Sequence, residues 1–181
     1  SISHFYKKKI NLYKDYRLSG TFIENKKKIK PPISLPWSLI TFRRSKNIIK
    51  VLRRNLKLKK FSHLDYGGYN GLLPYSLNQF FKVKSTVADY EKDGLEFAKK
   101  LGCRIINLKN QKIKKKYDFI SMVHVFEHLD NPRLTLKNLS QNCKINSYIY
   151  VETPNMFAVP LYDPTHLLSA NLNALEFSLE S

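Results

Sequence analysis

Two histidines and a glutamate stand close together as His124-x-x-Glu127-His128. An imidazole titrates near neutral pH, so His128 is a candidate general base, with Glu127 as a carboxylate that could orient it. A structural hydrogen-bonding role fits each histidine equally well. The phrase also matches the inverted zinc-protease signature, but that signature needs both histidines on one helix. Residues 118–124 form a β-branched and aromatic run that predicts a strand, which argues against a protease.

A glycine-rich segment, Leu64-Asp65-Tyr66-Gly67-Gly68-Tyr69-Asn70-Gly71, lies about sixty residues earlier. It predicts a buried strand that ends in a tight turn and opens a helix. Glycines in such a turn let backbone N–H groups approach a nucleotide-like ligand where a Cβ would collide. An ordinary turn is the alternative, because glycine pairs often follow strands.

Asp89 ends a second strand-like run, Val83 to Ala88, and is followed by a helical pattern from Lys92 to Leu101. A carboxylate at that place in a doubly wound sheet accepts hydrogen bonds from the ribose hydroxyls of a bound nucleoside. The alternative is a cap between strand and helix.

In this order the segments resemble the class I S-adenosylmethionine-dependent methyltransferases, over about the last two thirds of the chain. The glycine segment matches the family's first motif, and Ala88-Asp89-Tyr90 matches its acidic loop. Residues 117–132 are similar to the fourth strand and its loop, and residues 148–155 to the fifth strand. Tyr69 departs from the pattern, since the family usually has a third glycine there.

The resemblance implies S-adenosylmethionine as cofactor and a small-molecule methyl acceptor, such as a sugar or another intermediate of cell-surface or secondary-metabolite synthesis. His124 is then expected beside the methionine part of the cofactor, with Glu127 and His128 facing the substrate. His166 matches a histidine that related enzymes carry after the fifth strand and is the second candidate base. The implied cofactor-binding residues are Asp65, Gly67, Gly68, Gly71, Asp89, Tyr90 and His124.

Two other functions stay open. Some RNA 2′-O-methyltransferases, which the chain also resembles, hold a metal ion with a Glu-His pair in this loop, and His124, Glu127, His128 and His166 could form such a set. A set so rich in nitrogen favours zinc or another transition metal over magnesium. The third hypothesis is a non-catalytic binding module, which the bulky Tyr69 supports.

Strand-like and helix-like runs alternate from residue 61 onward and predict a doubly wound α/β fold with a mostly parallel sheet. The expected strands are 61–66, 83–88, 103–107, 118–124 and 147–153, and the expected helices are 72–81, 92–101 and 132–143. A further helix is expected from Ser169. The family's sheet normally has two more strands, so we expect a methyltransferase core, residues 61–181, that lacks them.

Residues 1–60 are expected to form a cap: a basic arm, a Pro-rich linker up to Trp37 and an amphipathic helix over 39–56. Ile48, Ile49, Val51, Leu52 and Leu56 are its apolar positions. This third of the chain carries 18 Lys and Arg against two acids, and the rest carries 14 against 12. Such a patch is suited to phosphate backbones, anionic lipid headgroups or an anionic substrate, and the alternative is a surface rich in Lys that is only solvated.

The length of 181 residues and 43% hydrophobic content predict one globular domain. No apolar run approaches the twenty residues that span a bilayer, and the start lacks a signal-peptide pattern. Cys103 and Cys143 stand alone, without the spacing of a disulfide framework or a thiolate zinc site. We therefore expect a cytoplasmic protein.

Overall fold

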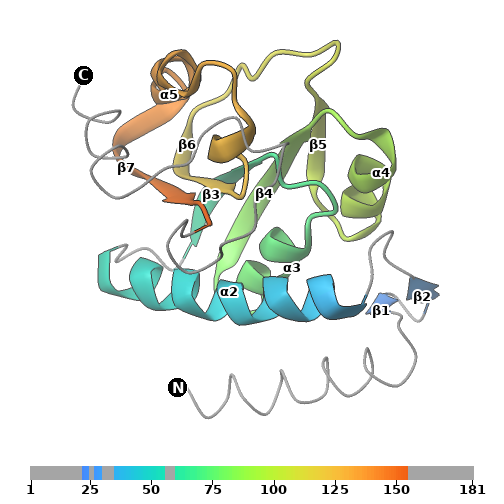
Figure 1. Ribbon diagram of the computed structural model, residues 1–181. Coiled ribbons are helices and arrows are strands. Elements are labelled where there is room, and N and C mark those ends of the chain that lie inside the picture. The colour runs from blue at the N-terminus through green and yellow to red at the C-terminus, as the bar shows by residue number, and fades with distance from the viewer. Residues whose placement is uncertain (1–21, 25–26, 30–34, 56–59, 155–181) are drawn as a thin grey trace.

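A computed structural model describes residues 22–24, 27–29, 35–55 and 60–154. Its main sheet has five parallel strands in the order β5-β4-β3-β6-β7 (Figure 1). These strands are β3 (Lys60–Tyr66), β4 (Lys82–Asp89), β5 (Arg104–Asn107), β6 (Tyr117–Val123) and β7 (Cys143–Glu152). The doubly wound α/β class expected from the sequence is confirmed.

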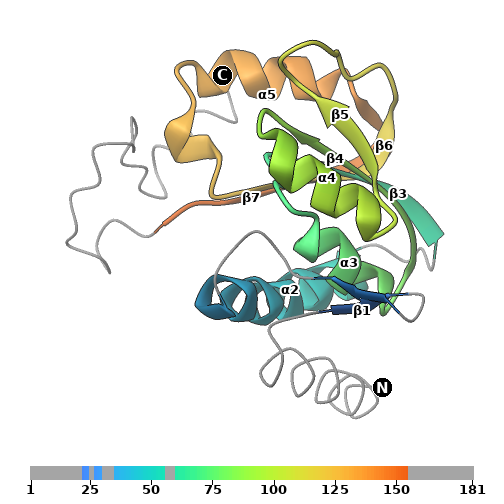
Figure 2. The same ribbon diagram turned by 90° about the vertical axis from the view of Figure 1, so that its right-hand side faces the viewer.

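Helices cover both faces of this sheet. They are α2 (Leu35–Asn55), α3 (Leu72–Asn78), α4 (Lys92–Lys100) and α5 (Pro132–Ser140), with a short 3-10 turn, η1 (Phe126–His128). Figures 1 and 2 show α2 and α3 together on one side and α5 on the other. Successive side chains of a strand point to opposite faces, so Phe119 packs with α2 and α3 while Ile120 packs with α5.

Several element bounds differ from those expected. The helix expected from residue 39 begins at Leu35, so the linker expected up to Trp37 is wrong for its last three residues. Pro36 is tolerated there because N–H groups in a first helical turn have no partner within the helix. The fifth strand begins at Cys143 instead of residue 147, with a register irregularity between Tyr117 and Phe119 opposite it.

The basic arm also contains a short antiparallel hairpin that the sequence analysis missed, formed by β1 (Phe22–Glu24) and β2 (Lys27–Ile29). The helix expected from Ser169 and His166 itself lie outside the described residues. Within the described part of the chain, no helix is long and apolar enough to cross a membrane.

Helix α2 is held against the sheet by an apolar stripe. Ile48, Ile49 and Leu52 are at most 5% exposed and pack with Phe61, Leu73, Leu77 and Phe119. Val51, expected on the same stripe, is 42% exposed, so that expectation is wrong. At 100° per residue, position 51 lies roughly 105° from the centre of the face formed by positions 48, 49 and 52, and therefore outside it.

We expect Ile48→Ala to lower the free energy of unfolding by about 2–4 kcal/mol, because the truncation removes buried methyl groups and leaves a cavity. Val51→Ala, on the same helix, should change it by less than about 1 kcal/mol. Urea titration of both variants measures this difference, and equal losses would show that α2 does not dock as described.

Candidate functional site

Three loops meet at the carboxyl edge of the sheet. In the parallel register Tyr66 of β3 is level with Ala88 of β4 and with Met122 of β6. The turn over residues 67–71, Asp89 with its following loop, and residues 124–128 therefore start side by side. Ligands of open α/β sheets bind at such an edge.

The turn after β3 needs glycine at its first position. Gly67 has φ of +70°, and a Cβ on it would lie 2.3 Å from Cγ2 of Val125. Its N–H donates to the carbonyl of Ala88 at 2.7 Å. Gly67 thus lets the turn pack against the loop after β6 and hydrogen bonds it to β4. These roles require glycine whether or not a ligand approaches the backbone here.

Tyr69, which stands where a glycine was expected, is accommodated by a second glycine. Its backbone has φ of +44°, a conformation that costs a non-glycine residue free energy. Its ring lies over Gly94 of α4, where an added Cβ would come within 2.3 Å of Cδ2. The bulk of Tyr69 is therefore directed against α4.

Asp89 ties two loops together. Its Oδ2 accepts a hydrogen bond from the N–H of Tyr69 at 2.8 Å, and its Oδ1 accepts one from the N–H of Glu91 at 2.9 Å. The bond to Glu91 forms a local turn before α4, whose N-cap is Glu91, so the alternative of Asp89 as the helix cap is wrong. The bond to Tyr69 orders the glycine turn. An ionised carboxylate has about four acceptor positions, so both oxygens retain capacity for a ligand hydroxyl. The side chain of neighbouring Tyr90 is exposed.

Asp65 is buried beneath this turn. Its Oδ1 accepts a hydrogen bond of 2.5 Å from the Ser121 hydroxyl, and that hydroxyl lies 2.8 Å from Nε2 of His63. Burial above all, and the charge of Asp89 in addition, raise the pKa of Asp65 to about 7 against the hydrogen bond from Ser121. Burial lowers the pKa of His63 to about 3. Both side chains are therefore largely held in their neutral forms near pH 6.

His124 is at the centre of a charged cluster. Its Nε2 lies 2.7 Å from Nη2 of Arg44, and its Nδ1 lies 3.1 Å from Oε1 of Glu127. Since a guanidinium only donates, Nε2 is the acceptor, and the ring hydrogen then belongs on Nδ1, facing Glu127. His124 has φ of +53°, and its N–H donates to the carbonyl of Glu152 at 2.8 Å. The ring is thus fixed in one tautomer and one orientation.

Glu152, at the end of β7, completes this cluster. Its carboxylate accepts hydrogen bonds from Nε of Arg44 and, at 2.9 Å, from the hydroxyl of Tyr150. Sequence reasoning gave no role to Arg44, Glu152 or Tyr150. A signal existed for Arg44, which precedes the buried Ile48 by four residues and so lies on the same helical face.

Glu127 is 1% exposed, whereas His128, at the end of η1, is exposed. Burial raises the pKa of Glu127, but the contact with His124 and the nearby imidazoles outweigh it and hold the pKa below its ordinary value. Glu127 is therefore an anion that holds His124. Between residues 43 and 154 as described, no three His, Cys, Asp or Glu side chains form a group that could hold a metal ion; His166 lies beyond this range.

The sequence matches one known protein family over most of its length. Residues 39–174 match the family model described as a methyltransferase domain. A search of the curated proteins finds no match.

Solved structures share the fold at low sequence identity. The plantazolicin methyltransferase BpumL, in complex with SAH, has 21% identity and a TM-score of 0.64 over 78% of this chain and 63% of its own. A SAM-dependent methyltransferase from Aquifex aeolicus has 22% identity and a TM-score of 0.58 over 77% of this chain and 86% of its own. Coclaurine N-methyltransferase, bound to N-methylheliamine and SAH, has 15% identity and a TM-score of 0.53 over 82% of this chain and 51% of its own. The chain thus spans less than two thirds of BpumL.

Asp65 and His63 should give opposite pH dependences of stability. The pKa of Asp65 rises on folding from 3.8 to about 7, so the folded state binds its proton more tightly than the unfolded state. This contribution to the free energy of unfolding is fully present below the unfolded pKa and is lost as pH rises toward the folded pKa. A histidine whose pKa falls, from 6.5 to about 3 for His63, loses its contribution as pH falls. Relative to the wild type, Asp65→Asn should become more stable as pH rises from 4.5 to about 6.5, and His63→Gln less stable, each by at most about 1.4 kcal/mol per pH unit. Urea unfolding across this range measures both slopes, and slopes of the same sign would contradict the assignment.

Gly94→Ala should destabilise the protein, although Ala is ordinarily favoured over Gly in a helix by roughly 0.5–1 kcal/mol. The cause is the Tyr69 ring, which occupies the space of the new Cβ. With Tyr69→Gly as background, Gly94→Ala should cost less, because the ring is gone and only the main-chain carbonyl carbon of position 69, at 2.9 Å, still contacts the new Cβ. Thermal unfolding of the four proteins forms a double-mutant cycle, and additive effects would refute the contact.

Proposed function

Because the chain belongs to the methyltransferase domain family, we propose that it transfers a methyl group from S-adenosylmethionine to a small-molecule acceptor. The observation that carries this proposal is the assembly of Asp89, the glycine turn and the His124 loop at one edge of the sheet. An acid and a turn rich in backbone donors are suited to the ribose and the methionine part of such a cofactor.

Unpaired buried polar atoms support the fit of the cofactor. Nδ2 of Asn70, in the glycine turn, and both carboxylate oxygens of Glu127, in the loop after β6, make no hydrogen bond with described residues. Buried polar groups rarely stay unpaired, so a free donor and a free carboxylate acceptor in adjacent loops support a ligand with both kinds of group. The cofactor, when bound, supplies a methyl group already activated on its sulfonium.

The protein then has to position the acceptor and manage its proton. Glu127 and Arg44 hold the His124 ring from opposite sides, so His124 can shape the edge of the cofactor site. His128, exposed at the end of the same loop, is the proposed general base for an acceptor hydroxyl or amine. His166 is kept as the second candidate base.

A small acceptor is the favoured substrate class. BpumL is also known in complex with desmethylPZN analogs, and coclaurine N-methyltransferase with N-methylheliamine. RNA is the alternative acceptor, supported only by the charge of residues 1–60. A non-catalytic binding module is distinguished from both by whether the chain binds cofactor.

We expect calorimetric titration with S-adenosylhomocysteine to show micromolar binding that Asp89→Ala weakens by about 1–3 kcal/mol, because partners of the lost carboxylate stay unpaired. Asp93→Ala removes an exposed acid four residues away and should leave the affinity unchanged within about threefold. Folding of each variant is checked by circular dichroism. No binding by the folded wild type would favour a non-catalytic module, and equal losses in the two variants would refute the role of Asp89.

A further inference from the structure

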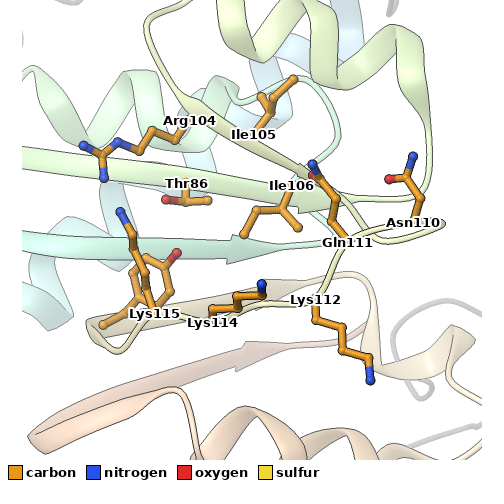
Figure 3. A pocket seen from close by; sticks show the side chains of 10 residues that line it. Thr86, Arg104, Ile105, Ile106, Asn110, Gln111, Lys112, Lys114 and Lys115 are labelled. Atoms are coloured by element: carbon orange, nitrogen blue, oxygen red, sulfur yellow. The ribbon is translucent and has the colours of Figure 1, made fainter.

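A cavity lies apart from the residues of the proposed cofactor site, under the connection between β5 and β6. This connection, residues 108–116, contains no helix. Together with the sheet it borders a space of about 620 Å³. Figure 3 shows the side chains that line this space. A volume of this size is typical of small-molecule sites.

The floor of the cavity belongs to the sheet face on which α5 packs. Thr86 is level with Arg104, and Ala88 with Ile106, across the β4–β5 pair. Ala88 lies in the core cluster beneath α5, so Thr86 and Ile106, which line the cavity, share that face. None of the residues proposed to bind the cofactor lines this space.

The wall of the cavity is positively charged. Arg104, Lys112, Lys114 and Lys115 line it, and no acidic residue does. None of the four forms an ion pair with a carboxylate in the described part of the chain, whereas Lys109, on the same connection, pairs with Glu91. Four unpaired like charges around one space repel each other, and a bound anion would relieve this repulsion.

The hydroxyl of Tyr117 is a buried polar group that the described part of the fold leaves without a hydrogen bond. The side chain is 3% exposed and lines the cavity, and its hydroxyl has no hydrogen-bond partner among the described residues. A buried unpaired hydroxyl is costly, so it is normally matched by a protein group, water or ligand. The only charged side chains lining its cavity are cations, which points to an acceptor supplied by a ligand.

We propose that this cavity binds a small phosphorylated molecule of about nucleoside-diphosphate size. Its phosphates lie among the side chains of Arg104, Lys112, Lys114 and Lys115, where Arg offers a fork of donors and Lys a mobile point charge. Its apolar part packs on Ile106, and the Tyr117 hydroxyl donates to one of its oxygens. This site does not depend on methyl transfer.

The test is calorimetric titration of the whole chain with ADP, pyrophosphate and uncharged adenosine at 0.15 M salt. ADP should bind and adenosine should not. Tyr117→Phe should weaken ADP binding about ten- to a hundredfold, the range for one lost hydrogen bond to a charged group. This variant keeps the ring and removes an unpaired hydroxyl, so it should fold at least as stably as the wild type.

A matched pair of double variants tests the charged wall. Lys114→Glu with Lys115→Glu should weaken ADP binding at least about thirtyfold, because two attractive charges become repulsive. Lys99→Glu with Lys100→Glu makes the same change of charge at exposed positions on α4 and should alter it less than about threefold. Equal losses in both double variants would show nonspecific attraction and overturn the proposal.

Two further arms separate this site from other occupants. Saturating S-adenosylhomocysteine should leave ADP binding unchanged, and competition would assign ADP to the cofactor site and overturn the proposal. The second arm uses a single-stranded RNA oligomer. If the RNA displaces ADP, and the Lys114→Glu, Lys115→Glu variant no longer binds it, the ligand of this site is nucleic acid and the proposal is overturned. Absence of ADP and pyrophosphate binding by the folded wild type would also refute it.

Discussion

The parallel register of β3 with its two neighbours is the constraint on which the candidate site depends. It brings the ends of β3, β4 and β6 to one edge, and it sets Asp65 opposite Ser121 so that their side chains hydrogen bond. A slip of one residue would turn these side chains to the opposite face and separate the glycine turn from Asp89. The buried polar chain from Asp65 through Ser121 to His63 favours this register, since any other would leave its members unpaired.

The Arg44–Glu152–His124–Glu127 cluster couples the N-terminal helix to the site. Arg44 comes from α2, Glu152 from β7, and His124 with Glu127 from the loop after β6. Two carboxylates and one guanidinium surround the imidazole of His124. The backbone of His124 has positive φ, and such a strained conformation persists only where surrounding contacts fix it. Docking of α2 by Ile48 and Leu52 is therefore part of the positioning of His124, because it brings Arg44 to the ring.

Much of the fold could be predicted because its elements obey local rules. Alternating buried strands, a glycine turn and a proline suited to a first helical turn after a cap at Asp130 or Asn131 are visible in the sequence. Asn131 is the cap, and its side chain accepts a hydrogen bond from the N–H of Leu134 at 2.9 Å. The start of β7 at Cys143 could not be predicted, because Cys143 pairs with Tyr117 across a register irregularity, and the regular pairing of β7 with β6 resumes only at Tyr148. The contacts of Arg44, and the packing of the Tyr69 ring on Gly94, are made between residues distant in sequence. No local pattern specifies such contacts.

The distribution of charge shows how an average over a segment can conceal a site. Residues 61–181 are nearly neutral, yet six of their 14 cations fall within residues 104–116, which contain no acid. Three of these lysines and Arg104 line one cavity with the unpaired Tyr117 hydroxyl, beside a sheet face that the connection covers without a helix. Solvation accounts for the number of these lysines, whereas an anionic ligand accounts for the absence of acids around one cavity and for the free hydroxyl.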